Sequence, residues 1–186
     1  MLILASNSPR RKELLKGLGV PFDVLVIKGI DESFPDTLAA ENVAEYIAKK
    51  KAAPYKEQLL AGNTVITADT VVVCEDEILG KPKDEADAHR MLRKLSGKTH
   101  QVYTGVCIVT KDLETSFSVR TDVTFKELTD DEILYYIREY KPFDKAGAYG
   151  IQEWIGYIGI TNIDGSYYNV MGLPVQRIYE VIKDIM

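Results

Sequence analysis

The stretch from residue 2 to residue 15 reads LILASNSPRRKELL, and it joins a short apolar run to the start of a helix. The apolar run at its beginning has the length and composition of a buried strand. Ser8 followed by Pro9 is typical of a helix N-terminus, because a serine side chain can cap backbone N–H groups and proline fits the first helical position. The sequence therefore predicts a strand, a turn and a helix that buries its leucines.

Three cations, Arg10, Arg11 and Lys12, follow in the first turn of that helix. The helix dipole is positive at this end, so each cation there costs roughly 0.3–1 kcal/mol. A bound anion would reverse the sign, because it would meet backbone N–H groups, the hydroxyls of Ser6 and Ser8, and the guanidinium groups. The turn is therefore either a site for a phosphate or carboxylate or a solvated basic turn.

The composition indicates a globular protein of one domain. The 186 residues are 46% hydrophobic and 27% charged, which allows a sizeable core, and we expect residues 1–186 to form a single domain. The net charge of −5 argues against a surface for nucleic acids or anionic membranes. With no signal peptide or membrane-spanning run expected, Cys74 and Cys107 are predicted to be buried free thiols in a reducing cytoplasm.

Hydrophobic periodicity divides the rest of the chain into strands and helices. It predicts strands at 22–27, 64–74, 101–110 and 116–125, helices at 37–53, 84–95 and 129–140, and a last helix that opens at Pro174. Residues 154–161 and 166–170 are predicted to pair as a hairpin. Because strands and helices mix without strict alternation, we expect an α/β fold of mixed α+β character. It would have a mixed, largely antiparallel twisted sheet flanked by helices, with a cleft between two lobes.

Asp69 interrupts the β-branched run TVITADTVVV at residues 64–73. Aspartate is depleted in strands, and a carboxylate in a core strand needs a partner. If the strand continues through Asp69, the carboxylate can hold a metal or act as a base. Otherwise, Asp69 and Thr70 form a bend between two short strands.

Two lysines are notable for their positions. Lys51 is the only one of three consecutive lysines that falls on the helical stripe of Val43 and Ile47, at steps of four. Its ammonium either extends along apolar surface towards water or points into a cleft. Lys81 precedes Pro82 after a short strand, which is a weaker signal.

The acids and cations together indicate a polyphosphate ligand and a divalent cation. Glu32 follows Asp31 after the second strand, and such paired acids form either a metal site or a solvated turn. Carboxylate oxygens bind magnesium and hold it against phosphate oxygens. Neither a P-loop nor a GxGxxG motif follows any predicted strand, which disfavours kinases, GTPases and dinucleotide-binding proteins.

A series of motifs resembles the Maf (septum formation) nucleotide pyrophosphatases, in one order along nearly the whole chain. The motifs are ASNSPRR at 5–11, KA at 51–52, ADTVV at 68–72, GKP at 80–82, MLRKLSG at 91–97, TGV at 104–106, DKAGAYGIQ at 144–152 and GSYYNVMGLP at 165–174. The resemblance implies that a nucleoside triphosphate is hydrolysed to the monophosphate and pyrophosphate. It also implies a divalent cation, Mg²⁺ or Mn²⁺, as cofactor.

The resemblance further implies a role for each motif residue. Asp69 would be the proton acceptor that activates water, and Glu32 with Asp69 would place the metal. The phosphate-binding residues would be Ser8, Arg11, Lys51 and Lys81. The residues that mark the subgroup associated with dTTP, UTP and modified pyrimidine triphosphates would be Arg10, Thr70 and Gln152. A sister group with an aromatic residue in place of Arg10 prefers modified purine triphosphates or substrates like 7-methyl-GTP.

The resemblance places this activity in the cytoplasm, in nucleotide-pool house-cleaning, with a link to division arrest. The alternative function is that of a non-catalytic regulator that binds a nucleotide or a division protein. Composition permits that alternative, whereas the complete set of acids and cations argues against it. We expect a nucleoside triphosphate as the partner, with no nucleic acid and no membrane, and a homodimer stays open.

Overall fold

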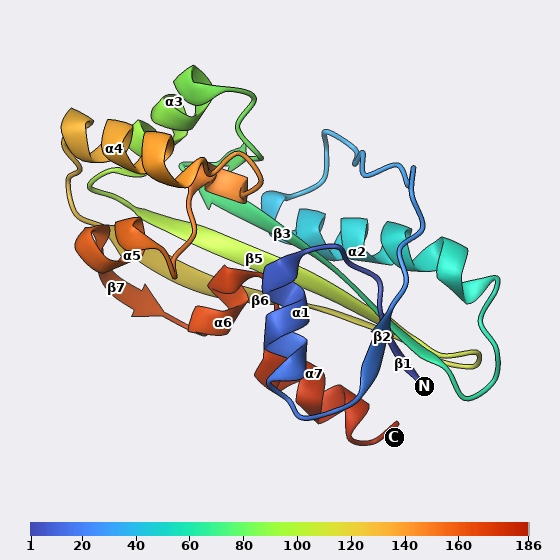
Figure 1. Ribbon diagram of the computed structural model, residues 1–186. Helices are drawn as coiled ribbons and strands as arrows, with labels where there is room; N and C mark the ends of the chain where they lie inside the picture. Colours follow the sequence, from blue (N-terminus) through green and yellow to red (C-terminus); the bar gives the residue numbers. More distant parts are fainter. Residues whose placement is uncertain (186) are drawn as a thin grey trace. The chain divides into compact units, whose positions relative to one another are not determined.

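The computed structural model describes residues 1–185 and has a mixed α/β architecture (Figure 1). The strands are β1 (Leu2–Leu4), β2 (Phe22–Val24), β3 (Thr64–Cys74), β4 (Glu77–Leu79), β5 (Thr99–Val109), β6 (Glu114–Phe125) and β7 (Ile160–Asp164). The helices are α1 (Pro9–Lys16), α2 (Ala40–Lys56), α3 (Glu85–Leu95), α4 (Asp130–Tyr140), α5 (Trp154–Gly159), α6 (Tyr167–Met171) and α7 (Val175–Ile182), with a 3-10 turn η1 at Ala146–Ala148.

The strands of the described residues form one seven-stranded sheet. Its order is β2-β1-β3-β5-β6-β7, and β4 pairs with β3. β1 is parallel to both β2 and β3, whereas β4 is antiparallel to β3 and β7 is antiparallel to β6. The predicted α/β fold with a mixed sheet is therefore confirmed.

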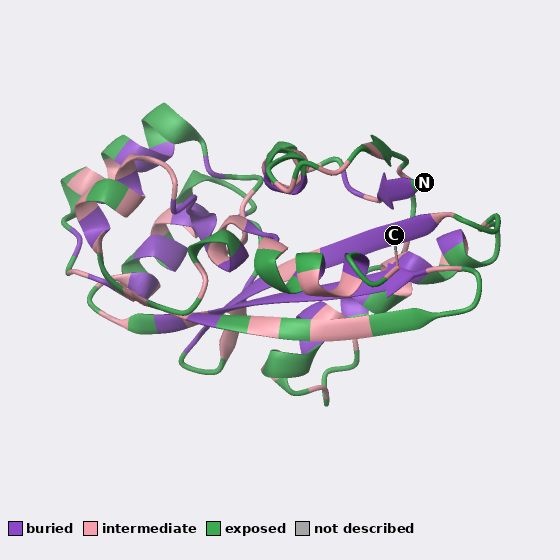
Figure 2. Ribbon diagram, turned by 90° about the horizontal axis from the view of Figure 1, so that it is seen from below, coloured by how far each residue is buried: buried purple, intermediate pink, exposed green. Residues whose placement is uncertain are grey.

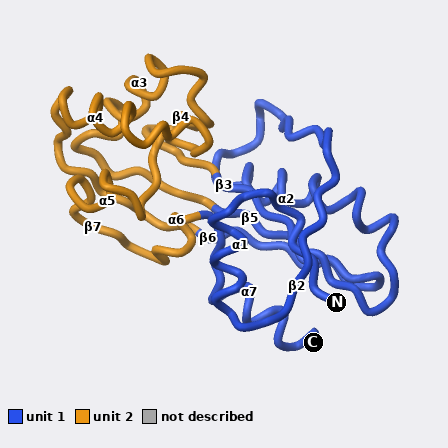
Figure 3. The backbone as a smooth tube through the Cα atoms, viewed as in Figure 1, with its two compact units in different colours: residues 1–70, 104–119, 172–186 blue, residues 71–103, 120–171 orange. Residues whose placement is uncertain are grey.

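The chain divides into two compact units (Figure 3). Unit 1 comprises residues 1–70, 104–119 and 172–186, and unit 2 comprises residues 71–103 and 120–171. The chain passes from one unit to the other within β3, β5 and β6, and again after α6. A single domain over residues 1–186 stays a prediction.

In unit 1, α2 packs on strands β1, β3 and β5. The buried residues of this core are Ile3, Ala48, Ala52, Tyr55, Val65, Cys107 and Val109. Gly105 of β5 lets the helix come close, because a Cβ atom there would lie 2.1 Å from the backbone nitrogen of Glu45 in α2. Long strands of the sheet are largely purple, and therefore buried, in Figure 2.

Unit 2 has its own core, formed by α3, α4, α5 and the strand segments of this unit. Its largest fully buried side chains include Phe125, Tyr136 and Ile155. The helix predicted at 129–140 is confirmed as α4, and it begins with a capping box, since Thr129 and Glu132 each accept the other's backbone N–H. Cys74 and Cys107 are buried and free, as predicted, and the side chain of Asp84 caps the start of α3.

The prediction that Pro54 ends the second helix is wrong, because α2 continues to Lys56. Proline removes one helical hydrogen bond, and tertiary contacts can offset that cost. The contacts come from Tyr55, which is buried; its hydroxyl accepts the N–H of Ile27 at 2.7 Å and donates to the Leu25 carbonyl at 3.1 Å.

The predicted hairpin of residues 154–161 and 166–170 is also wrong. The first segment forms α5 and the start of β7, the second lies largely in α6, and β7 pairs with β6 instead. Gly156 lies against the Ile151 carbonyl, where a Cβ would be only 1.8 Å from the oxygen, and Gly159 lies against Phe125. These close approaches suit a tight helical turn, which the aromatic and β-branched composition did not indicate.

Two smaller results complete the comparison. The strand predicted at 22–27 ends at Val24, because its partner β1 ends at Leu4, the residue paired with Val24. The terminal helix begins after Pro174 as predicted and buries Ile178 and Ile182. Over the described part of the chain, no helix has both the length and the apolar composition needed to cross a membrane.

Candidate active site

The start of α1 has the predicted cap, and this cap uses N–H groups that an anion was expected to meet. Ser8 Oγ accepts the N–H of Arg11 at 3.4 Å, and the Ser8 carbonyl accepts the N–H of Lys12 at 3.1 Å. Ser6 Oγ accepts the N–H of Ser8 at 3.2 Å. The expectation of free backbone N–H groups needs correction at these positions. A hydroxyl that accepts a hydrogen bond keeps its own proton to donate, so the two serines can still offer O–H donors to an anion.

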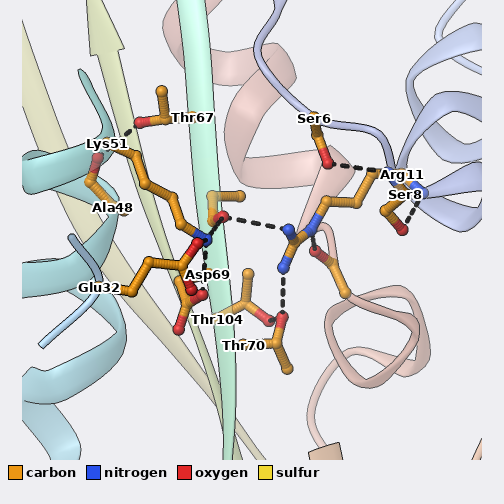
Figure 4. Close-up of polar contacts among 12 residues, drawn as sticks. Ser6, Ser8, Arg11, Glu32, Ala48, Lys51, Thr67, Asp69, Thr70 and Thr104 are labelled. Atoms are coloured by element: carbon orange, nitrogen blue, oxygen red, sulfur yellow. Dashed lines mark hydrogen bonds and ion pairs between the residues drawn. The ribbon is translucent and has the colours of Figure 1, made fainter. Parts of the chain in front are cut away.

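Arg11 is held by three acceptors of the protein (Figure 4). Its Nε donates to the Gly172 carbonyl at 2.8 Å, its Nη1 to the Ala68 carbonyl at 3.1 Å, and its Nη2 to Thr70 Oγ1 at 3.0 Å. A guanidinium has five N–H groups. The three bonds therefore fix its plane and leave two N–H groups for a ligand.

Burial and a neighbouring charge act on Arg11 in opposite directions. Burial lowers the pKa of its guanidinium from the ordinary value, whereas the carboxylate of Asp69 raises it. Arginine stays protonated in proteins, so Arg11 places a fixed positive charge inside unit 1. Arg10, which follows Pro9 in α1, is partly buried, and its charge lowers the pKa of Arg11 further.

Asp69 lies inside β3, which runs without interruption from Thr64 to Cys74. The alternative of a bend between two short strands is therefore wrong. The Asp69 side chain is only 16% exposed, and its Oδ1 accepts a hydrogen bond from Lys51 Nζ at 2.8 Å. A carboxylate in a core strand needed a partner, and Lys51 is that partner.

Lys51 points from α2 towards Asp69 (Figure 4), so of the two alternatives for its ammonium the structure favours the one that points inwards. Its Nζ also lies 3.3 Å from Glu32 Oε1 and 3.4 Å from the Ala68 carbonyl. The preceding lysines differ: Lys49 is exposed, and Lys50 bonds to Asp31 instead. Only Lys51 brings α2 into the group around Asp69.

One hydroxyl on the neighbouring strand extends the group beyond the predicted residues. Thr70 Oγ1, which accepts from Arg11, lies 2.9 Å from Thr104 Oγ1. Thr104 is fully buried in β5. Sequence reasoning assigned no role to Thr104 or to the Gly172 carbonyl, although both lie in motifs that carried the resemblance. A buried hydroxyl in an apolar strand was the available signal.

Seven of the nine predicted site residues belong to unit 1: Arg10 lies in the first turn of α1, and the other six come together. These six are Ser8, Arg11, Glu32, Lys51, Asp69 and Thr70. Lys81 and Gln152 belong to unit 2, where Lys81 is exposed and Gln152 Oε1 is buried with no hydrogen-bond partner in the described residues. Within residues 1–185, no three His, Cys, Asp or Glu side chains form a group that could hold a metal ion.

Comparison with known proteins adds a family match. The family model for Maf-like protein matches residues 1–185. A dTTP/UTP pyrophosphatase of Phocaeicola vulgatus is 59% identical over 184 residues, which cover 99% of this chain and 95% of that protein. A dTTP/UTP pyrophosphatase of Parabacteroides distasonis is 54% identical over 182 residues, covering 98% of this chain and 94% of that protein.

A solved structure supports the fold. The Staphylococcus aureus Ham1 protein is similar to this chain with a TM-score of 0.54, covering 100% of this chain and 99% of that one. Its sequence identity is 19%, so the likeness concerns the fold alone.

Proposed function

Because the chain belongs to the Maf-like protein family, we propose that it is a nucleoside triphosphate pyrophosphatase that hydrolyses dTTP and UTP to the monophosphate and pyrophosphate. The observation that carries this proposal is the group in unit 1 in which Asp69, paired with Lys51, lies near the fixed guanidinium of Arg11. The two relatives described above are more than 50% identical to this chain over nearly their whole length, and both are named dTTP/UTP pyrophosphatases. These names support dTTP and UTP as the substrates.

The cations of unit 1 suit the triphosphate chain. Arg11 is already oriented by three acceptors, so binding a phosphate costs it little further side-chain entropy. Charge-assisted hydrogen bonds from a guanidinium to phosphate are among the strong ones. The hydroxyls of Ser6 and Ser8 add donors at the same turn. Lys51 of unit 1 and Lys81 of unit 2 are also proposed to bind phosphate, as the resemblance implies.

Asp69 is the proposed proton acceptor. In the reaction, the oxygen of a water molecule forms a bond to the α-phosphorus. The bond from the α-phosphorus to the oxygen that bridges it to the β-phosphorus breaks, and pyrophosphate leaves with the electron pair of that bond. The water must lose a proton, and a carboxylate within hydrogen-bond reach of it can take that proton. Before the nucleotide binds, Lys51 holds one oxygen of Asp69 at 2.8 Å and thereby orients the carboxylate.

The donor chemistry of the group fits a hard divalent cation, Mg²⁺ or Mn²⁺. Glu32 Oε1 and Asp69 Oδ1 both lie close to the same ammonium, at 3.3 and 2.8 Å. Magnesium commonly takes one or two carboxylates and completes its shell with substrate phosphates and water, so two acidic side chains suffice. When bound, the cation would offset negative charge on the phosphate oxygens.

Selection among nucleotides would depend on Arg10, Thr70 and Gln152. The buried Oε1 of Gln152 has no hydrogen-bond partner in the described residues, and such an acceptor costs free energy until a donor reaches it. A uracil or thymine base offers an N–H donor on its pairing edge. In these two bases the donor is N3–H, which lies between two carbonyl acceptors, and a base that places its donor elsewhere on that edge would leave Oε1 unsatisfied and would be disfavoured.

The test is product analysis with purified protein. We expect pyrophosphate and the monophosphate from dTTP and UTP, with Mg²⁺ or Mn²⁺ required. Orthophosphate as the first product would contradict the proposal, since it means attack at the terminal phosphate. Binding of the nucleotide without any turnover would favour the non-catalytic regulator.

A further inference from the structure

The ammonium of Lys51 lies where the two carboxylates proposed for the metal converge (Figure 4). Its Nζ is 2.8 Å from Asp69 Oδ1 and 3.3 Å from Glu32 Oε1. A magnesium ion on the same two oxygens would lie about 2 Å from each. It would then overlap the ammonium or face it at a distance where like charges repel strongly. Lys51 and a metal ion cannot hold these two oxygens at the same time.

We propose that Lys51 is an internal cation that keeps a divalent metal off Asp69 and Glu32 until a polyphosphate draws the lysine away. The inference rests on the proposed function, because it takes the triphosphate as the anion that receives Lys51. Lysine has a flexible four-carbon stem, so its ammonium can move between neighbouring anions while α2 stays in place.

Burial explains why Lys51 does not simply give way to the metal. The side chains of Lys51 and Asp69 are each 16% exposed. A largely desolvated ammonium that loses its carboxylates without gaining another anion is strongly disfavoured. A triphosphate supplies that anion and also offers oxygen ligands to the metal. Nucleotide and metal therefore raise each other's affinity, since coupling between two ligands is reciprocal.

Lys50 is a matched control on the same helix. Its Nζ lies 2.9 Å from Asp31 Oδ2 and 2.7 Å from the Ser33 carbonyl, one residue away along the same acidic loop. It has no bond to Asp69 or Glu32 among the described residues. Removing its charge changes the net charge of the protein by the same amount but leaves the two carboxylates of the proposed metal site paired with Lys51.

The experiment measures Mn²⁺ binding to nucleotide-free protein by electron paramagnetic resonance of the free ion. The variant Lys51→Met keeps the stem and removes the charge, and we expect it to bind Mn²⁺ at least about tenfold more tightly than the wild type. Lys51→Arg keeps the charge and is expected to bind as weakly as the wild type. Lys50→Met is also expected to match the wild type. In the Lys51→Met background, Glu32→Gln is expected to reverse the gain.

Thermal unfolding with and without Mn²⁺ covers the case in which Lys51→Met is less stable. The rise in Tm on adding Mn²⁺ is then expected to be larger for Lys51→Met than for the wild type or Lys50→Met. Equal Mn²⁺ affinity and equal rises in Tm in all proteins, or the same gain in Lys50→Met, would overturn the proposal. Metal binding is measured without turnover, so failure of the wild type to release pyrophosphate would refute the proposed function separately.

Discussion

At Asp69, one carboxylate combines burial, a fixed orientation and a neighbouring cation. The side chain sits in the middle of an apolar strand and bonds to Lys51 through a single oxygen. The other oxygen has no hydrogen bond to the described residues, so it can accept a proton. An apolar side chain would suit this position of the strand better, so Asp69 contributes more to the chemistry of the site than to the stability of the fold.

Replacing Asp69 by asparagine keeps the size of the side chain and removes its charge and basicity. We expect Asp69→Asn to lose at least about 10² in turnover of dTTP while remaining folded, because an amide still bonds to Lys51. Steady-state kinetics and circular dichroism check the two halves of this expectation. Turnover near the wild-type value in a folded variant would exclude Asp69 as base or metal ligand.

Thr104 illustrates how a buried residue can act through its neighbours. Its hydroxyl lies 2.9 Å from Thr70 Oγ1, which also accepts from Arg11. The Thr70 hydroxyl can therefore donate its proton to Thr104 Oγ1. Alternatively, it can accept a hydrogen bond from Thr104 and donate its own proton to a ligand. The hydroxyl of Thr104 therefore helps to set the direction in which the Thr70 hydroxyl, proposed for substrate selection, donates its proton.

We expect Thr104→Val, which keeps the shape and loses the hydroxyl, to lower kcat/KM for dTTP roughly three- to tenfold, the size of one hydrogen bond. The ratio of kcat/KM between dTTP and a purine triphosphate is expected to change as well, which lost stability alone would not cause. Thr104→Ser restores the hydroxyl and is expected to restore the ratio. An unchanged ratio in Thr104→Val would leave Thr104 a packing residue.

At the scale of elements, the position of α2 decides where Lys51 lies. Thr67 of β3 donates to the Ala48 carbonyl at 2.7 Å, which anchors the helix to the sheet. Gly105 of β5 allows close contact at the next strand, with only 2.1 Å between a built Cβ and Glu45 N. Both contacts are to backbone atoms, so α2 has little freedom to shift away from the sheet.

A methyl group at Gly105 must therefore push α2 from β5. We expect Gly105→Ala to lower the free energy of unfolding by at least about 2 kcal/mol, as overpacking against backbone does, and to weaken catalysis by moving Lys51. The matched control is Gly80→Ala, since a Cβ at Gly80 would have no neighbour within 4 Å. Urea unfolding of both variants measures the effect, and equal stability of the two would contradict the close packing.

At the scale of the whole molecule, each compact unit is assembled from separated pieces of chain. Residues 1–70, 104–119 and 172–186 make up unit 1. No continuous fragment of the chain therefore contains either unit alone. The group around Asp69 shows the consequence, because its members come from all three pieces: Arg11 and Asp69 from the first, Thr104 from the second and Gly172 from the third.

The stability of the folded chain is expected to depend on His100. This histidine is fully buried, its Nε2 lies 2.6 Å from the Tyr149 hydroxyl, and burial lowers its pKa from 6.5 to about 4. Below pH 6.5, His100 of the unfolded chain binds a proton, whereas His100 of the folded chain stays neutral until the pH approaches 4. The folded state is therefore favoured above pH 6.5 and loses up to about 3 kcal/mol as the pH falls to 4.

Urea unfolding at pH 7 and at pH 4.5 measures this loss. His100→Gln keeps a partner for Tyr149 and removes the titrating group, so its unfolding free energy is expected to fall less over the same interval than that of the wild type. Carboxylates titrate in both proteins, and the difference between the two isolates His100. Parallel pH dependence of wild type and His100→Gln would show that the folded protein accepts the proton.

Features that depend on a few neighbouring residues could be predicted from the sequence. The Ser8 cap of α1, the capping box of α4 and the strand at 64–74 all arise from local hydrogen bonds and periodicity. The placement of Lys51 on the inner face of its helix followed from the helical repeat alone.

Only the tertiary structure decided which distant segments meet. Composition favoured a hairpin near the end of the chain, but β7 pairs with β6, and Pro54 failed to end α2 because Tyr55 bonds to residues 25 and 27. Arg11 bonds to Gly172, 161 positions away. Local patterns limit the backbone within a few residues, whereas the choice among distant partners depends on packing and hydrogen bonds that exist only once the chain has folded.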